Sequence, residues 1–406
     1  MQDILSQGGG RKPRPWRPWV AAAAVLLAAA VVIVQHPPGH RQARGQPGRA
    51  AVTASSAASG AAAVVAGQPK GPDGIVGHTL PWDTRLGLPA TGKQPAWFWP
   101  AAGQLKPIGG LPPQRSGYQF TRVSGGWAVQ ANTGVQPGCG SCVGPVRSVY
   151  FLADRAGAVT RVGLAGAVAP GATAGALWLT SYPPGADART AAGRAREVSV
   201  AGAPLGPPLT LPTGFVIDRA TDRGLLLAPV APRSATAAYE LWDPGRRQVM
   251  RAFPGEIAAS AREIAWAAPC TRQCRVHVLN LVTARPTVIE LPAGNSVANA
   301  AFSPDGRFLA LQVSFANNGD DGALDMQLDV ASVATGRLMN VPRVSVSSDA
   351  LVSFGWPASS DVLVAALSFT ARVQLAAWRP GTGRLAVADV RPRQSPGALI
   401  IGPSAR

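Results

Sequence analysis

Four cysteines stand in two closely spaced pairs, and such pairs can form disulfides, bind zinc or exchange electrons. Cys139 and Cys142 are separated by two residues, and Cys270 and Cys274 by three. Redox chemistry favours a first cysteine at a helix N-terminus, whereas the first pair has the glycine and proline flanks of a loop. Two local disulfides, Cys139–Cys142 and Cys270–Cys274, are the favoured interpretation. A redox pair, a zinc site shared by both pairs and cross-pairing between repeats are the alternatives.

An oxygen-rich segment, Asn-Asn-Gly-Asp-Asp-Gly at 317–322 with Asp325 close behind, has the ligand chemistry that calcium prefers. It separates two strand-like segments, 308–313 and 326–330, where a polar hairpin tip is also expected. The spacing does not match an EF-hand loop. We therefore interpret the segment as a solvated loop, with a weak cation site as the alternative.

Histidine chemistry has little support in this chain. His277 lies in a strand-like segment, so a structural role is expected. His78 has Asp73 and Asp83 near it in sequence, which leaves a catalytic or metal role as the less favoured interpretation. The chain also lacks a G-x-S-x-G nucleophile elbow with suitable partners. We predict no catalytic residue, no cofactor and no metal site, and hence a protein that is not an enzyme.

Short strand–turn–strand patterns recur along most of the chain, at intervals of about 47 residues. Their turns fall near residues 103, 157, 202, 245, 284, 336 and 383. Additional apolar strands are expected between these hairpins, at 126–130, 176–180, 224–230, 264–268, 308–313 and 362–367. No long segment has helical periodicity, which argues against a parallel α/β fold. Six tryptophans at or near these strands are expected to pack between repeats, with a carbohydrate- or peptide-binding face as the alternative: Trp127, Trp178, Trp242, Trp266, Trp356 and Trp378.

The most distinctive motif, Phe302–Leu311, is a tight turn followed by a strand. Pro304 fixes φ for the turn, Asp305 can accept a bond from its own backbone, and Gly306 tolerates a positive φ, with Ser303 preceding them. This S-P-D-G turn and strand resemble the repeat of TolB-like and WD40-like β-propellers. Weaker versions follow Trp242 and Trp378.

The resemblance covers roughly residues 75–401 and implies an all-β propeller. We expect seven four-stranded blades, with six or eight as alternatives. A spare strand at 398–401 is expected to pair with the incomplete first blade and close the ring. The whole plan also resembles a group of uncharacterised actinobacterial envelope proteins. It differs from TolB itself, because no separate N-terminal α/β domain is found.

The N-terminal part resembles a membrane-targeting segment. A basic tail at 1–19 precedes an apolar run at 20–34, and we expect a signal anchor over 20–36. A cleaved signal peptide and a buried soluble helix are the alternatives. An Ala-, Gly- and Pro-rich linker at 37–73 then leads to the propeller at 74–406. The basic tail predicts a cytoplasmic N-terminus, a single membrane span and an extracellular, oxidising location for the propeller.

The net charge of +17 comes mostly from arginine, since only four of the 38 basic residues are lysines. Codon bias in a high-GC genome explains the excess, and attraction to an acidic envelope surface is the alternative. No nucleic-acid-binding module accompanies the scattered arginines. The sequence favours a non-catalytic envelope protein that binds a protein, peptide or glycan. A hydrolase or lyase with an acidic site at the central channel, and a sensor that acts through a partner, are the alternatives.

Overall fold

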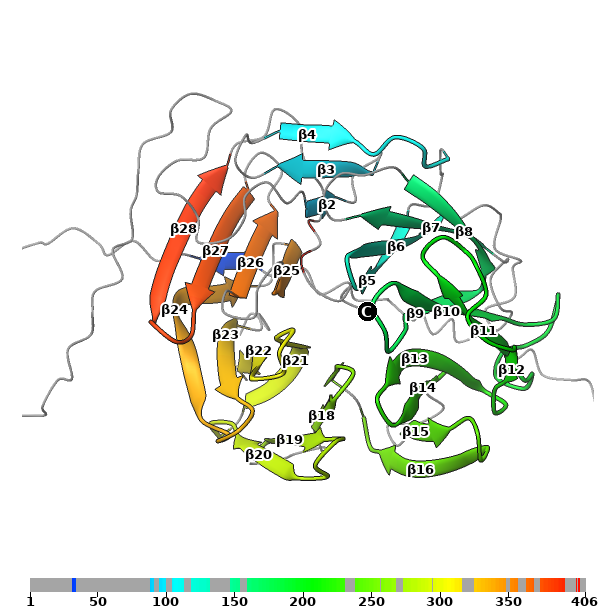
Figure 1. Ribbon diagram of the computed structural model, residues 1–406. Helices are drawn as coiled ribbons and strands as arrows, with labels where there is room; N and C mark the ends of the chain where they lie inside the picture. The colour runs from blue at the N-terminus through cyan, green and yellow to red at the C-terminus, as the bar shows by residue number, and fades with distance from the viewer. Residues whose placement is uncertain are drawn as a thin grey trace, which may run out of the picture.

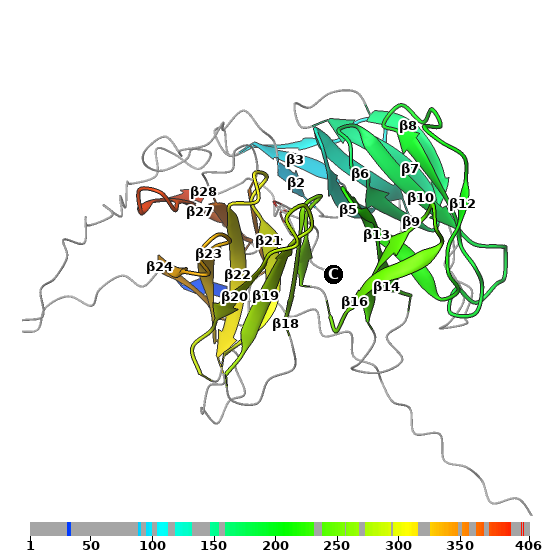
Figure 2. The ribbon, with the colours of Figure 1, turned by 60° about the horizontal axis from the view of Figure 1, so that its bottom comes forward.

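The fold is seen in a computed structural model (Figure 1). The structure describes residues 31–33, 88–90, 95–99, 104–112, 118–131, 147–153, 159–230, 238–255, 257–267, 273–293, 295–315, 325–347, 351–356, 363–368, 373–390, 399 and 401. Within these residues the secondary structure is entirely β, and the strands form seven antiparallel sheets arranged as a ring (Figures 1 and 2).

Six of the sheets contain four consecutive strands each, and we call them blades A to F. Blade A contains β5 (Tyr118–Val123), β6 (Gly126–Ala131), β7 (Arg147–Ala153) and β8 (Val159–Ala165). Blade B contains β9 (Ala167–Pro170), β10 (Ala176–Ser181), β11 (Arg194–Ser199) and β12 (Leu209–Thr210). Blade C contains β13 (Phe215–Thr221), β14 (Gly224–Pro229), β15 (Tyr239–Asp243) and β16 (Gln248–Phe253). Blade D contains β17 (Ala258–Ala259), β18 (Glu263–Ala267), β19 (Arg275–Asn280) and β20 (Pro286–Glu290). Blade E contains β21 (Asn295–Phe302), β22 (Phe308–Phe315), β23 (Asp325–Ser332) and β24 (Leu338–Ser347). Blade F contains β25 (Leu351–Gly355), β26 (Leu363–Ser368), β27 (Val373–Arg379) and β28 (Arg384–Val390).

The remaining sheet lies between blades F and A, and we call it the closing sheet (Figure 1). It has three strands, β2 (Leu88–Ala90), β3 (Ala96–Trp99) and β4 (Gln104–Pro107). On its inner side Ala90 forms an antiparallel bridge with Leu399. The expectation of seven four-stranded blades is therefore correct for six sheets, whereas the first unit supplies only three strands of its own. The expected pairing of the C-terminal segment with that unit is confirmed by the Leu399 bridge.

The blades follow from alternating sequence patterns. In β22, Leu309, Leu311 and Val313 join the buried cluster shared with blade D, whereas Ala310 joins the cluster shared with blade F. A strand places alternate side chains on opposite faces, so a strand buried on both faces is almost continuously apolar. One buried cluster fills each of the seven junctions between neighbouring sheets. All six tryptophans expected between repeats belong to these clusters, which confirms their structural role.

The two ends of the ring differ in their connections. Within each blade, strand 1 is innermost and strand 4 outermost. The turns between strands 1 and 2 and between strands 3 and 4 share one end, which we call the turn face. The connections between strands 2 and 3 and between successive sheets lie at the opposite end, the loop face. The seven expected hairpins are the strand 3–strand 4 hairpins of the closing sheet and blades A to F, so this prediction is confirmed.

The N-terminal segment contributes one short strand. β1 (Val31–Ile33) adds a fifth strand to blade E by pairing with the outer edge of β24, where Ile33 lies opposite Ser345. These residues belong to the predicted anchor at 20–36, most of which lies outside the described residues. Among the residues that the structure describes, there is no helix of the length and apolarity needed to cross a membrane. The basic tail at 1–19 and the linker at 37–73 also lie outside the described residues.

Closure of the ring generates the first testable prediction. Leu399 is 2% exposed and packs with Phe98 and with blade F, so Leu399→Ala should lower the free energy of unfolding by about 2–5 kcal/mol. Leu205→Ala is the matched control, because Leu205 is 52% exposed. Urea unfolding followed by tryptophan fluorescence measures both. If deleting residues 395–406 left the unfolding midpoint unchanged, the closure would be refuted.

Candidate functional site

The expected turn motif lies at the turn face of blade E, between β21 and β22. Gly306 has a φ of 70° and donates its N–H to the carbonyl of Ser303 at 2.9 Å. The Ser303 Oγ donates to Asp305 Oδ1 at 2.7 Å and accepts the Phe308 N–H at 2.9 Å. The Asp305 carboxylate also accepts the Arg307 N–H and its Nε–H. Each residue thus has the turn-forming role expected from the sequence.

This turn also forms one wall of a buried polar site that sequence reasoning missed. A Cβ on Gly306 would lie 2.7 and 2.8 Å from the two carboxylate oxygens of Glu263. Glu263 begins β18 in the neighbouring blade D and is only 6% exposed. The absence of a side chain at Gly306 therefore makes room for the carboxylate. We call Glu263, Ser260, Asn280 and Gly306 the Glu263 cluster.

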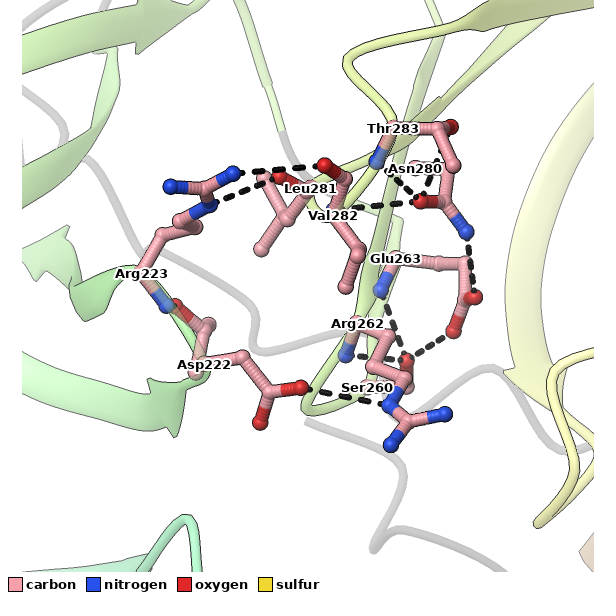
Figure 3. Close-up of polar contacts among 10 residues, drawn as sticks. Asp222, Arg223, Ser260, Arg262, Glu263, Asn280, Leu281, Val282 and Thr283 are labelled. Atoms are coloured by element: carbon pink, nitrogen blue, oxygen red, sulfur yellow. Dashed lines mark hydrogen bonds and ion pairs between the residues drawn. The ribbon is translucent and has the colours of Figure 1, made fainter.

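Neutral side chains of blade D hold the Glu263 carboxylate (Figure 3). The Ser260 Oγ donates to Oε2 at 2.5 Å, and the Asn280 Nδ2 donates to Oε1 at 3.1 Å. Ser260 in turn accepts the backbone N–H groups of Arg262 and Glu263. Asn280 Oδ1 accepts N–H groups from Val282 and Thr283. The cluster therefore fixes both turns of blade D at once.

Burial raises the pKa of Glu263 above its ordinary value of 4.5. The hydrogen bonds from Ser260 and Asn280 and the charge of Arg262 act in the opposite direction, and the nearby Asp222 adds a smaller upward effect. Desolvation is the largest of these causes. The site therefore takes up a proton more readily than an exposed glutamate.

Blade C is clamped to the same two turns from the other side (Figure 3). The Asp222 N–H donates to the carbonyl of Ala261 at 2.8 Å, and the Asp222 carboxylate pairs with Arg262 at 3.2 Å. Arg223 donates from Nε to the carbonyl of Leu281 and from Nη2 to that of Val282, at 3.0 and 3.2 Å. Contacts through the Glu263 cluster and this clamp thus connect blades C, D and E across the turn face.

No family model matches the chain. No curated protein matches it either. Among solved structures, one of a study of two prolyl endopeptidases is 12% identical with a TM-score of 0.46, over 77% of this chain and 52% of that one. The chain thus spans about half the length of that protein.

Two further structures are similar to part of this chain. Apo AztD from Citrobacter koseri is 10% identical with a TM-score of 0.38, over 79% of this chain and 98% of that one. The uncharacterized protein lmo1340 from Listeria monocytogenes EGD-e is 10% identical with a TM-score of 0.42, over 70% of this chain and 86% of that one. The propeller fold itself is established by the strand pairing described above.

Other carboxyl groups with a raised pKa also lie within the blades. Burial is the main cause for Glu197 in β11, Glu240 in β15 and Asp329 in β23. Asp329 is 1% exposed, and it accepts hydrogen bonds from Gln327 at 2.7 Å and Asn340 at 2.9 Å. All of these groups, like Glu263, belong to strand 2 or strand 3 of a blade. None of them belongs to the innermost strand of its blade.

The remaining residues singled out from the sequence are placed as follows. Cys274 is buried and disulfide-bonded, whereas Cys139, Cys142 and Cys270 lie outside the described residues, so the predicted pairing stays a prediction. His78 and the segment 317–322 also lie outside them. His277 lies in β19 and stacks on Trp266, with ring centroids 5.3 Å apart, as a structural residue would. Within the described ranges, no three His, Cys, Asp or Glu side chains gather as candidate metal ligands.

Gly306→Ala tests the contact between blades D and E. A positive φ alone costs a non-glycine residue about 1–2 kcal/mol, and the collision with Glu263 adds to this cost. Gly125→Ala is the matched control, because Gly125 has a φ of 78° in the equivalent turn of blade A with nothing near its Cβ position. We expect Gly306→Ala to reduce the free energy of unfolding by about 1–3 kcal/mol more than the control. Equal losses, or an excess that persists in a Glu263→Ala background, would contradict the contact.

The protonation of Glu263 gives a pH-dependent prediction. Because its folded-state pKa is raised, burying the charge destabilises the fold above that pKa, and the destabilisation disappears as pH falls toward 4.5. We expect Glu263→Gln to be most favourable relative to wild type near pH 7 and to lose this relative advantage toward pH 4.5. Urea unfolding midpoints of wild type and Glu263→Gln, measured between pH 4.5 and 7, test how the difference in stability changes with pH. Glu290→Gln is the control for loss of one charge, because Glu290 is an exposed partner of Arg275. A pH-independent difference for Glu263→Gln would contradict the prediction.

Proposed function

We propose that the chain is a membrane-anchored propeller outside the cytoplasm that binds a protein, peptide or glycan without catalysing a reaction. The observation that carries this proposal is the composition of the innermost strands. Arg122 in β5, whose guanidinium lies over the ring of Trp127, and Arg219 in β13 are the cationic residues of these strands, beside mainly apolar and small residues. Asp218 contributes a carboxylate next to Arg219. Such an edge suits recognition of a ligand surface better than acid–base chemistry, which needs titratable side chains positioned against the reacting group.

The buried carboxyl groups support the same conclusion. Glu263 and Asp329 have neutral hydrogen-bond donors of their own blade as partners, so their raised pKa values have a structural explanation. Perturbed acids mark candidate catalytic sites only where they also converge in a cleft. On the strength of the S-P-D-G turn, we further propose that the chain is related to TolB-like or WD40-like propellers. We also propose that it is related to actinobacterial envelope proteins of the same plan.

The membrane anchor at 20–36 is the other half of the proposal. Its support is the basic tail followed by the apolar run. Insertion of this segment would release the pairing of β1 with β24, which involves three residues. The linker at 37–73 would then join the membrane to the propeller. The N-terminus would be cytoplasmic and the propeller extracellular.

Protease accessibility in intact cells tests the topology. We expect external protease to digest the propeller while an N-terminal epitope tag stays protected, and a chain without residues 20–36 to fractionate as a soluble protein. A wild-type chain released from the membrane with a new N-terminus after residue 34 would show a cleaved signal peptide instead.

Photo-crosslinking from the innermost strands tests ligand binding. A photoreactive residue at Arg219 should give a discrete adduct with an envelope component, and one at Thr160, which is exposed on β8, should not. Identical adduct patterns at the two positions would argue against a ligand at the channel. Turnover of an envelope polymer that Asp218→Asn abolishes would favour the hydrolase or lyase alternative.

A further inference from the structure

Exposed arginines gather at the turn face of three consecutive blades. They belong to the turns of blades C, D and E, and every one of these side chains is exposed: Arg223, Arg246, Arg247, Arg262, Arg285, Arg307 and Arg337. Three of them hold equivalent places, immediately before the outermost strand of their blade. Arg247 precedes β16, Arg285 precedes β20 and Arg337 precedes β24. The repeat thus presents one arginine per blade along an arc, which we call the arginine arc.

The turns that present the arginine arc have a net positive charge, because their aspartates do not neutralise all of their arginines. Arg246, Arg262 and Arg307 pair with Asp243, Asp222 and Asp305, respectively. Arg223 donates to two backbone carbonyls of blade D. Arg247, Arg285 and Arg337 form no side-chain ion pair within the part of the chain that the structure describes. Their guanidinium groups therefore remain available for an external anion.

Apolar side chains are also exposed at this face. Val282, in the turn between β19 and β20, is 50% exposed, and Leu205, in the turn between β11 and β12, is 52% exposed. The backbone carbonyl of Val282 accepts a hydrogen bond from Arg223, and Val282 stands three residues before Arg285 in the same turn. Exposed apolar side chains among basic ones are typical of surfaces that lie at a membrane interface. A soluble acidic polymer would provide no apolar environment in which Val282 and Leu205 could be buried.

The first described strand of the closing sheet also begins at this face. Leu399 occupies the position of strand 1 in the closing sheet, and β2 occupies that of strand 2. Strand 2 of every blade begins at the turn face, so Leu88, the first residue of β2, lies at that face. An anchor inserted in the membrane, with the pairing of β1 to Ser345–Ser347 released, would be joined through the linker at 37–73 to a ring whose β2 begins at the face that presents the arginine arc.

We infer that the turn face is a docking surface for the anionic phospholipid headgroups of the membrane that holds the anchor. This inference rests on the anchor of the proposed function. Guanidinium groups bind phosphate in a bidentate manner, and Val282 and Leu205, which are exposed at the same face, enter the headgroup layer. The propeller then lies with its turn face on the bilayer and its loop face away from it. Each basic residue near an anionic surface strengthens binding about fivefold at low salt, since it contributes about 1 kcal/mol.

Hydrogen exchange of the full chain in lipid nanodiscs tests this orientation. One set of discs contains phosphatidylcholine only, and the other contains phosphatidylglycerol and phosphatidylcholine in equal amounts. We expect amides in turns 281–285 and 333–337 to exchange about tenfold more slowly in the anionic discs. At 1 M salt, where the screening length falls to about 3 Å, the difference should disappear.

A triple variant and a charge-matched control localise the effect. Arg247→Gln, Arg285→Gln and Arg337→Gln together should remove the protection, and these exposed side chains leave the backbone bonds of their turns in place. Gln also keeps the Cβ at Arg247, whose φ of 53° is already positive. The control is Arg161→Gln, Arg194→Gln and Arg196→Gln, three exposed residues of β8 and β11, and it should leave the protection unchanged. Arg285→Glu alone gives a second variant, with partial loss expected.

Each outcome decides the inference. Equal exchange in the two kinds of disc, or equal loss of protection in the triple variant and its control, would overturn it. A chain that is not retained in either disc would refute the anchor. Flotation of that chain with phosphatidylglycerol vesicles then tests the arginine arc separately: flotation that needs Arg247, Arg285 and Arg337 supports the docking surface, and failure to float overturns it.

Discussion

The ring depends on one constraint, which is that a sheet apolar on both faces must be covered on both sides. A free sheet at either end of a row would expose such a face, so the row closes on itself. Every junction between neighbouring sheets contains its own buried cluster. The closing sheet is the critical member, because its three strands need Leu399 and Ile401 to complete the cluster beside blade F. The geometry of both faces follows from this closure.

Directional polar contacts complement the apolar junctions. Apolar burial is non-directional, so it permits neighbouring blades to slide against each other. The Asp222–Arg223 clamp opposes such sliding between blades C and D. The Glu263 carboxylate is held by hydrogen bonds within blade D and meets blade E by a close steric fit against Gly306. Burying the Glu263 carboxylate costs free energy, and the hydrogen bonds from Ser260 and Asn280 offset part of that cost. The S-P-D-G turn therefore has two roles, to reverse the chain and to leave space for a neighbour's carboxylate.

The sequence predicted outer strands better than inner ones. Strands 2, 3 and 4 have clear apolar runs and turn residues, so their hairpins were predicted throughout the ring. The innermost strands are harder to predict, since β17 is only Ala258–Ala259 and β9 ends at Pro170. Glu263 was missed because its environment depends on Gly306 in the next blade, which no local pattern reveals. A usable signal existed: Ser260 stands three residues before a glutamate that opens an otherwise apolar strand. The arginine arc was likewise visible only after the repeats had been placed in register.

The bridge between Ala90 and Leu399 also affects the order in which the protein can mature. Ala90 is synthesised long before Leu399, so β2 waits with an unpaired inner edge while blades A to F are being made. Pairings between residues so distant in sequence form slowly, and an unpaired strand edge is prone to incorrect association. This edge of β2 therefore stays without its C-terminal partner until the last residues of the ring have been made. Completion of the ring in this sense reports that the chain has been made through residue 401, because only then can Leu399 pair with Ala90.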